Sequence, residues 1–139
     1  MDVQINMWAV LLATASTMVV GFVWYAPKVF GKTWMKLIGK KQKDLAGSAV
    51  PAIVGTIVVS FLSAYILAHV TFLSHEFFRN SFMQDALTTG FWLWLGFVAA
   101  RFVTHDLFER RPLRLTILNL SHEFVTVMVM ALIIGWLQP

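Results

Sequence analysis

The sequence predicts an all-α membrane protein: a bundle of four transmembrane helices, with a short interfacial amphipathic helix after the first. Of the 139 residues, 58% are hydrophobic and 13% are charged, whereas a soluble domain carries roughly 25% charged residues. The apolar residues form four runs, each of about 18 to 25 residues, which is enough to cross a hydrocarbon core of roughly 30 Å as a helix. The basic residues lie almost entirely between these runs.

We expect a single integral membrane domain over residues 1–139, with spans at about 5–26, 49–72, 84–104 and 113–137. The first span ends at Pro27, which cannot continue a helix. Trp24 and Tyr25 precede this proline, and aromatic residues at such a place are typical anchors at the membrane interface. No positively charged region precedes this span and no small-residue cleavage site follows it, so we do not expect a cleaved signal peptide.

Every fourth residue of the first span is small, which makes a ridge for helix packing: Ala9, Ala13, Thr17 and Gly21. In lipid, such a ridge lets another helix approach closely. A bundle of four helices has little interior of its own. We therefore expect a homo-oligomer, with a dimer favoured.

The connection between the first two spans is rich in lysine. Lys28, Lys32 and Lys36 recur every four residues, and apolar residues, among them Trp34, fill other positions. We predict a helix over about 28–38 that lies in the membrane interface and binds anionic lipids through these lysines and Trp34. A solvated basic loop is the alternative interpretation.

The charges also predict an orientation. Ten of the eleven Lys and Arg residues, counting Arg101, lie in or beside the connections after the first and third spans. The positive-inside bias therefore predicts a multi-pass protein of the cell (cytoplasmic) membrane with both termini outside. The same signal accounts for the net charge of +4, so we expect no nucleic-acid partner.

Polar residues inside the last span mark the candidate functional site. Four of them share one helical face because they are spaced at offsets of zero, three, four and seven: Asn119, His122, Glu123 and Thr126. If the hydrocarbon core begins near Thr116, Glu123 lies roughly 10 Å inside it. A carboxylate at such a depth is expensive and indicates a functional site by default.

Three interpretations of Glu123 are open. In the first, Arg101 of the antiparallel third span pairs with Glu123, helped by Asn119, and fixes the register of the last two spans. In the second, Glu123 is a proton or cation site on a water-filled path, and His122 or Arg101 tunes its pKa. In the third, Glu123 faces a partner subunit.

Other chemistry has little support in the sequence. His122 and Glu123 are adjacent and point about 100° apart on a helix, so they cannot easily chelate one ion. No four-ligand metal set can be assembled from neighbouring positions, the chain has no cysteine, and Ser121 beside His122 is not a catalytic triad. We therefore expect no enzyme, no metal and no cofactor.

Three stretches and one further residue form a pattern that is more specific than four apolar runs: Gly21 to Pro27 (GFVWYAP), Phe30 to Trp34 (FGKTW), Phe108 to Leu113 (FERRPL), and Asn119. Together they resemble the membrane protein family called domain of unknown function 1761. The resemblance covers nearly the whole chain. It implies a small four-helix membrane protein, and the family name carries no activity with it.

Two functions remain open. The first is a proton- or ion-linked transport or channel-like protein that uses the intramembrane carboxylate of Glu123, with a proton or a small cation as the transported species. The alternative is a non-catalytic membrane scaffold or a component that binds lipid or a protein partner. In that alternative Arg101 and Glu123 form a structural pair, and the lysine-rich segment holds anionic lipid or a cytoplasmic partner.

Overall fold

The computed structural model describes residues 3–45 and 49–139. In these ranges every regular element is helical, and four helices are long and apolar enough to cross a membrane. The predicted all-α fold is confirmed, and the protein is a multi-pass membrane protein. The elements are α1 (Met7–Trp24), α2 (Gly31–Ile38), α3 (Gln42–Leu45), α4 (Ala49–Phe78), α5 (Phe82–Leu93), the π-helical segment η2 (Trp94–Ala99), α6 (Ala100–Phe108) and α7 (Leu113–Leu137).

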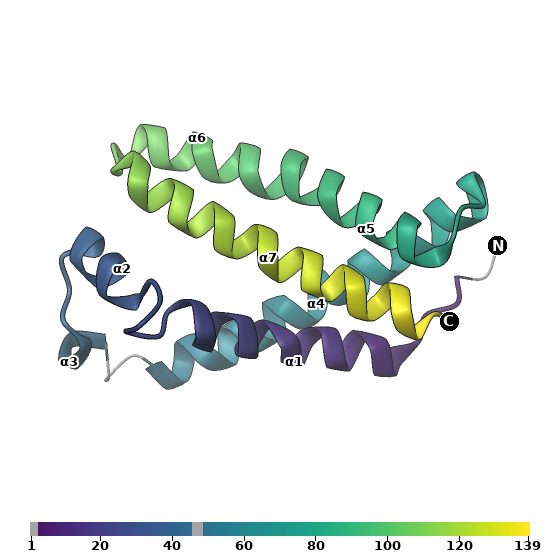
Figure 1. Ribbon diagram of the computed structural model, residues 1–139, viewed down its shortest axis with the longest axis horizontal. Coiled ribbons are helices and arrows are strands. Elements are labelled where there is room, and N and C mark those ends of the chain that lie inside the picture. Colours follow the sequence, from purple (N-terminus) through teal and green to yellow (C-terminus); the bar gives the residue numbers. More distant parts are fainter. Residues whose placement is uncertain (1–2, 46–48) are drawn as a thin grey trace.

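The long helices form a ring in which α1 and α5 each contact both α7 and α4. Both termini and the α4–α5 turn lie at one end, here called the terminal end, whereas α2 and the α6–α7 turn lie at the other, the basic end (Figure 1). Figure 1 also shows α4 crossing behind α1 and α7 between the two ends. Because α4 is inclined to the other spans, its buried residues all lie at Ser60 or beyond.

The hydrophobic core lies toward the terminal end. It consists mainly of alanines and medium-sized apolar residues: Ala9, Val10, Ala13, Ala64, Leu67, Ala68, Phe82, Met130, Ala131 and Ile134. Small side chains let helix backbones approach closely in a membrane protein. Asn6 adds a polar tie at this end, because its side-chain amide donates to the carbonyl oxygens of Leu137 and Gln138, each at 3.0 Å.

The second and third spans extend further than hydropathy predicts. The helix α4 continues to Phe78, past the predicted end near residue 72, and the third span covers Phe82–Phe108 rather than 84–104. The connection expected between residues 72 and 84 is a turn of residues 79–81. Hydropathy marks where the apolar run ends, whereas a hydrogen-bonded helix can continue through polar residues at the end of a span.

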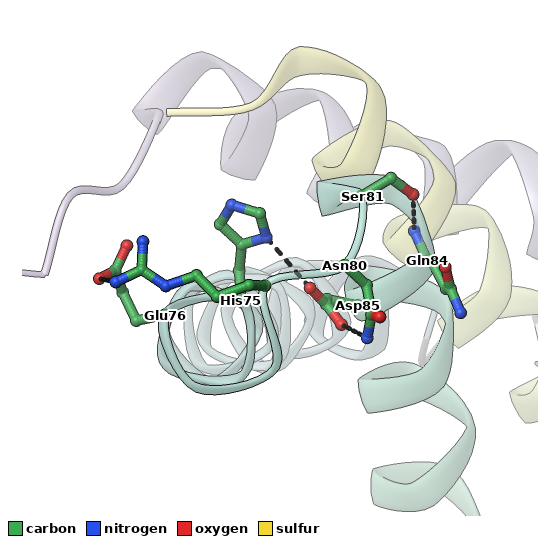
Figure 2. A network of polar contacts seen from close by, with 7 residues as sticks. His75, Glu76, Asn80, Ser81, Gln84 and Asp85 are labelled. Atoms are coloured by element: carbon green, nitrogen blue, oxygen red, sulfur yellow. Dashed lines mark hydrogen bonds and ion pairs between the residues drawn. The ribbon is translucent and has the colours of Figure 1, made fainter.

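Polar contacts of a buried carboxylate, Asp85, stabilise this turn (Figure 2). Asp85 is 2% exposed, and one of its oxygens accepts a hydrogen bond from Asn80 Nδ2 at 2.9 Å. Its other oxygen lies 3.0 Å from His75 Nδ1, whose ring also contacts Phe82. Both carboxylate oxygens are therefore satisfied, and the network joins α4 to α5.

At the basic end a tight turn leads from α1 into α2. A β-carbon on Gly31 would lie 2.1 Å from the carbonyl oxygen of Tyr25, so only glycine fits there. The helix α2 begins at Gly31, which leaves Lys28 in the preceding turn rather than in the helix. Gly39 has a φ of 67° and ends α2, as expected for a residue that tolerates the left-handed region.

A second buried carboxylate joins the last two spans at the basic end. Asp106 is 5% exposed, and one of its oxygens accepts a hydrogen bond from the Thr116 hydroxyl at 2.6 Å. Its backbone carbonyl accepts from the backbone N–H of Arg111 at 3.0 Å. The start of α7 is thereby held against the end of α6, while α4 has no comparable tie to α6 among the described residues.

Candidate functional site

A cavity of about 1490 Å³ lies between the first part of α4 and the facing parts of α1, η2 and α7. It forms where α4 leans away from the other spans. Ile57, Ile66 and Phe97 at its edge are 43%, 46% and 74% exposed, and all three lie within membrane-capable helices, so the cavity opens on the flank of the bundle. The wall is mostly apolar, and its polar or ring N–H-bearing members are Thr17, Tyr25, Thr56, Ser60, Ser63, Trp94, His122, Glu123 and Thr126.

Glu123 is the one carboxylate among the described residues of the cavity wall, and its side chain is 38% exposed. Its ionisable neighbour is His122, whose Nδ1 lies 3.4 Å from Glu123 Oε1. Arg101 is exposed on α6, and within the described ranges it forms no ion pair with Glu123. These two residues therefore do not make the structural pair considered from the sequence.

The π-helical segment explains why Arg101 could not be placed from the sequence. A π segment adds a residue to the helical turn, so residues beyond it are rotated relative to those before it. Trp94, Phe97 and Val98 of η2 line the cavity, and such segments are frequent at functional sites. The sequence contains no pattern that predicts this π-helical segment.

The end of α1 and the turn after it bring two aromatic rings to His122. The ring centroids of Tyr25 and Trp24 lie 5.0 Å and 5.9 Å from that of His122. The Tyr25 hydroxyl donates a long hydrogen bond of 3.4 Å to Asn119 Oδ1. Both rings therefore pack against α7, and the expected anchoring of Trp24 and Tyr25 at the membrane interface stays a prediction.

Tyr25 follows the last residue of α1 and stays protonated. Burial, and after it the negative charge of Glu123, raises the pKa of its hydroxyl to about 12. The phenol is therefore a hydrogen-bond donor at neutral pH, and it connects Asn119 with the surroundings of His122. Tyr25 is a site residue that sequence reasoning missed, because an aromatic residue at the end of a span is usually an interface anchor.

Several polar atoms of the cavity wall are buried without a hydrogen-bond partner in the described part of the chain: Trp94 Nε1, His122 Nε2 and Thr126 Oγ1. Buried polar groups are normally satisfied by protein, water or ligand. The Thr17 hydroxyl, by contrast, donates to Ser60 Oγ at 3.1 Å, which joins α1 to α4 beside the cavity. The predicted polar face of α7 therefore has unused bonding capacity next to a carboxylate.

The ridge of small residues on α1 is used inside the chain. Ala9, Ala13 and Thr17 are 3%, 0% and 5% exposed, and a β-carbon on Gly21 would lie 3.8 Å from His122 Nε2. The ridge is thus a helix-packing surface within this bundle. It gives no support to the expected dimer, which stays a prediction.

The helix α2 and the turn before it lie next to the site. Lys28, Lys32 and Lys36 are exposed, whereas Trp34 is partly buried and its ring centroid lies 5.1 Å from that of Tyr25. The aromatic contact runs from α2 through Tyr25 to His122. Trp34, predicted to touch lipid, therefore packs on the protein.

The geometry is suited to holding a proton or a cation beside a carboxylate inside an apolar wall. In the described residues no group of three His, Cys, Asp or Glu side chains is placed to hold a metal ion.

Residues 8–135 match the family described as protein of unknown function (DUF1761). Neither a curated protein nor a solved structure matches the chain.

Proposed function

We propose that this chain, which belongs to the DUF1761 family of proteins of unknown function, is a proton- or ion-linked transport or channel-like protein that works through Glu123. One observation carries the proposal: a carboxylate within a membrane span lines a large open cavity, and no arginine or lysine among the described residues neutralises it. A carboxylate that served packing alone would be expected to pair, because an uncompensated charge among spans is costly.

The neighbours of Glu123 are suited to proton or cation exchange. His122 shares a hydrogen bond with it whenever Nδ1 carries a proton, and Tyr25 adds a hydroxyl from the turn after α1. The wall residues contributed by α4 and η2 are not ionisable within the described ranges. Glu123 and His122 are therefore the groups that we propose to take up and release the transported proton or small cation.

The proposal is tested with purified protein in liposomes, by comparing pH-driven flux of protons and small cations through wild type and Glu123→Gln. This substitution keeps the size of the side chain and removes its charge. The matched control is Glu76→Gln, which removes a carboxylate of the terminal end that pairs with Arg79. We expect flux in the wild type and in the control, and none in Glu123→Gln. Equal flux in all three proteins, or none in the wild type, would overturn the proposal.

The helix α2 favours a second candidate function, a non-catalytic component that binds anionic lipid or a protein partner. Its exposed lysines lie beside partly buried apolar residues, an arrangement typical of interfacial helices. Replacing Lys28, Lys32 and Lys36 with Gln should weaken binding to anionic vesicles by about 1 kcal/mol per charge. Glu123→Gln should leave that binding unchanged, and unchanged binding in the lysine variant would exclude lipid binding by these lysines.

A further inference from the structure

The cavity carries a net negative character that its own wall does not cancel. Glu123 is the one formally charged side chain among the described wall residues, and Arg101 is exposed and does not line the cavity. His122 cancels the charge only while it is protonated. An occupant that brings a positive charge therefore gains more in this cavity than a neutral or anionic one, because low-dielectric surroundings strengthen the attraction.

The rest of the wall favours an apolar occupant. Phe22, Trp94 and Phe97 contribute aromatic rings, and the α4 side contributes aliphatic residues such as Ile53 and Ile57. Aromatic faces attract cations as well as apolar groups. At about 1490 Å³, the cavity exceeds the roughly 300 to 1,000 Å³ of pockets that hold drug-sized ligands, so an organic ion fits where a bare metal ion would leave the wall unfilled.

The opening indicates the route of entry. The edge residues Ile57, Ile66 and Phe97 lie within membrane-capable helices and are exposed on the flank of the bundle. A molecule that dissolves in lipid can therefore reach the cavity sideways. Toward the terminal end the cavity stops at the packed alanine-rich core.

We propose that the cavity binds an apolar organic cation that enters from the bilayer and places its positive charge beside the Glu123 carboxylate. This inference rests on the proposed function, because it names the class of substrate for the same site. The charge of the occupant is what distinguishes it from a lipid acyl chain or from a helix of a second copy.

The test is equilibrium binding to protein in nanodiscs of uncharged, zwitterionic lipid, with empty nanodiscs subtracted. The two probes are tetraphenylphosphonium and tetraphenylborate, which match closely in size and apolar surface and differ in the sign of their charge. We expect saturable binding of the phosphonium and none of the borate. Glu123→Gln should lower the phosphonium affinity about tenfold or more, whereas Glu76→Gln should leave it unchanged.

A second variant guards against loss of binding through misfolding. A β-carbon on Gly55 would meet nothing within 4 Å, and Gly55 lines the cavity, so Gly55→Phe should fill the space at wild-type thermal stability and abolish phosphonium binding. Equal binding of both probes, no saturable binding, or binding unaffected by Glu123→Gln would overturn the inference. Phosphonium binding without ion flux would support the bound organic cation and refute the transport proposal. Proton flux without phosphonium binding would support transport and refute the bound organic cation.

Discussion

The two halves of the bundle are packed in opposite ways. Toward the terminal end, alanines of α1, α4 and α7 bring the helices together, and the core lies there. Toward the basic end, α4 departs from η2 and α7 and leaves the cavity that holds Glu123. One set of spans thus provides a sealed half and an open half, and the ionisable groups of the last span lie in the open one.

The glycines show the same difference. A β-carbon on Gly135 would lie 2.8 Å from Met83 Sδ and 3.0 Å from Met83 Cα, and one on Gly90 would lie 3.1 Å from Ala131 Cβ. Corresponding atoms on Gly55 or Gly96 would meet nothing within 4 Å. Gly135 and Gly90 therefore permit close helix contact in the sealed half, whereas Gly55 and Gly96 adjoin free space.

The largest expected effect comes from enlarging a glycine of the sealed half. Gly135→Leu should destabilise the protein by about 3 kcal/mol, because overpacking forces the backbone near Met83 to move. Unfolding in mild detergent measures this effect, with Gly55→Leu as the matched control in the open half. The control should unfold at or above the wild-type midpoint, since a glycine inside a helix costs about 1 kcal/mol relative to alanine. Similar losses in both variants would remove the distinction between the halves.

An intermediate effect is expected from the network at the α4–α5 turn. His75→Leu leaves one oxygen of the buried Asp85 without its partner, which should cost about 1 to 3 kcal/mol of unfolding free energy. Glu76→Gln, at the next position, breaks an ion pair with an Arg79 side chain that is 71% exposed, so it should cost at most about 1 kcal/mol. If the two variants proved equally stable, the turn would not be what holds the sealed half together.

The smallest effect should come from the boundary between the halves. Thr17 donates to Ser60 at 3.1 Å where α4 begins to lean away from α1. Hydrogen bonds between membrane helices contribute on average about 0.6 kcal/mol. A double-mutant cycle of Thr17→Val and Ser60→Ala should return a coupling of that order, and a coupling of zero would show that α4 is positioned by packing alone.

Much of the fold followed from hydropathy, because four apolar runs of sufficient length can hardly be accommodated otherwise. The last helix has the bounds expected from the sequence, Leu113–Leu137, since Pro112 defines its start. The end of α4 did not follow, because the helix continues through His75 and Glu76 after the apolar run has ended. Helix ends that depend on tertiary contacts cannot be read from hydropathy.

The site residues that share one helix could be predicted from the sequence, whereas the contacts between helices could not. Helical spacing placed His122, Glu123 and Thr126 on one face, and all three line the cavity. The contribution of Tyr25 depends on a turn closed by the contact between Gly31 and the Tyr25 carbonyl. The helical face on which Arg101 lies depends on the π segment Trp94–Ala99, because such a segment rotates later residues relative to earlier ones. Both are properties of backbone geometry that residue types alone do not reveal.

The most direct test of an open half with a negative site uses thiol accessibility, because the chain has no cysteine of its own. Ser63 lines the cavity, whereas its neighbour Ala64 is 0% exposed in the core. In liposomes, Ser63→Cys should react with a cationic methanethiosulfonate reagent and Ala64→Cys should not. Adding Glu123→Gln should slow the reaction of Ser63→Cys with the cationic reagent. The reaction of Ser63→Cys with an anionic methanethiosulfonate reagent should not become slower. Equal reactivity at both positions would contradict an open half with a negative site. So would a reaction rate with the cationic reagent that is the same with and without Glu123→Gln.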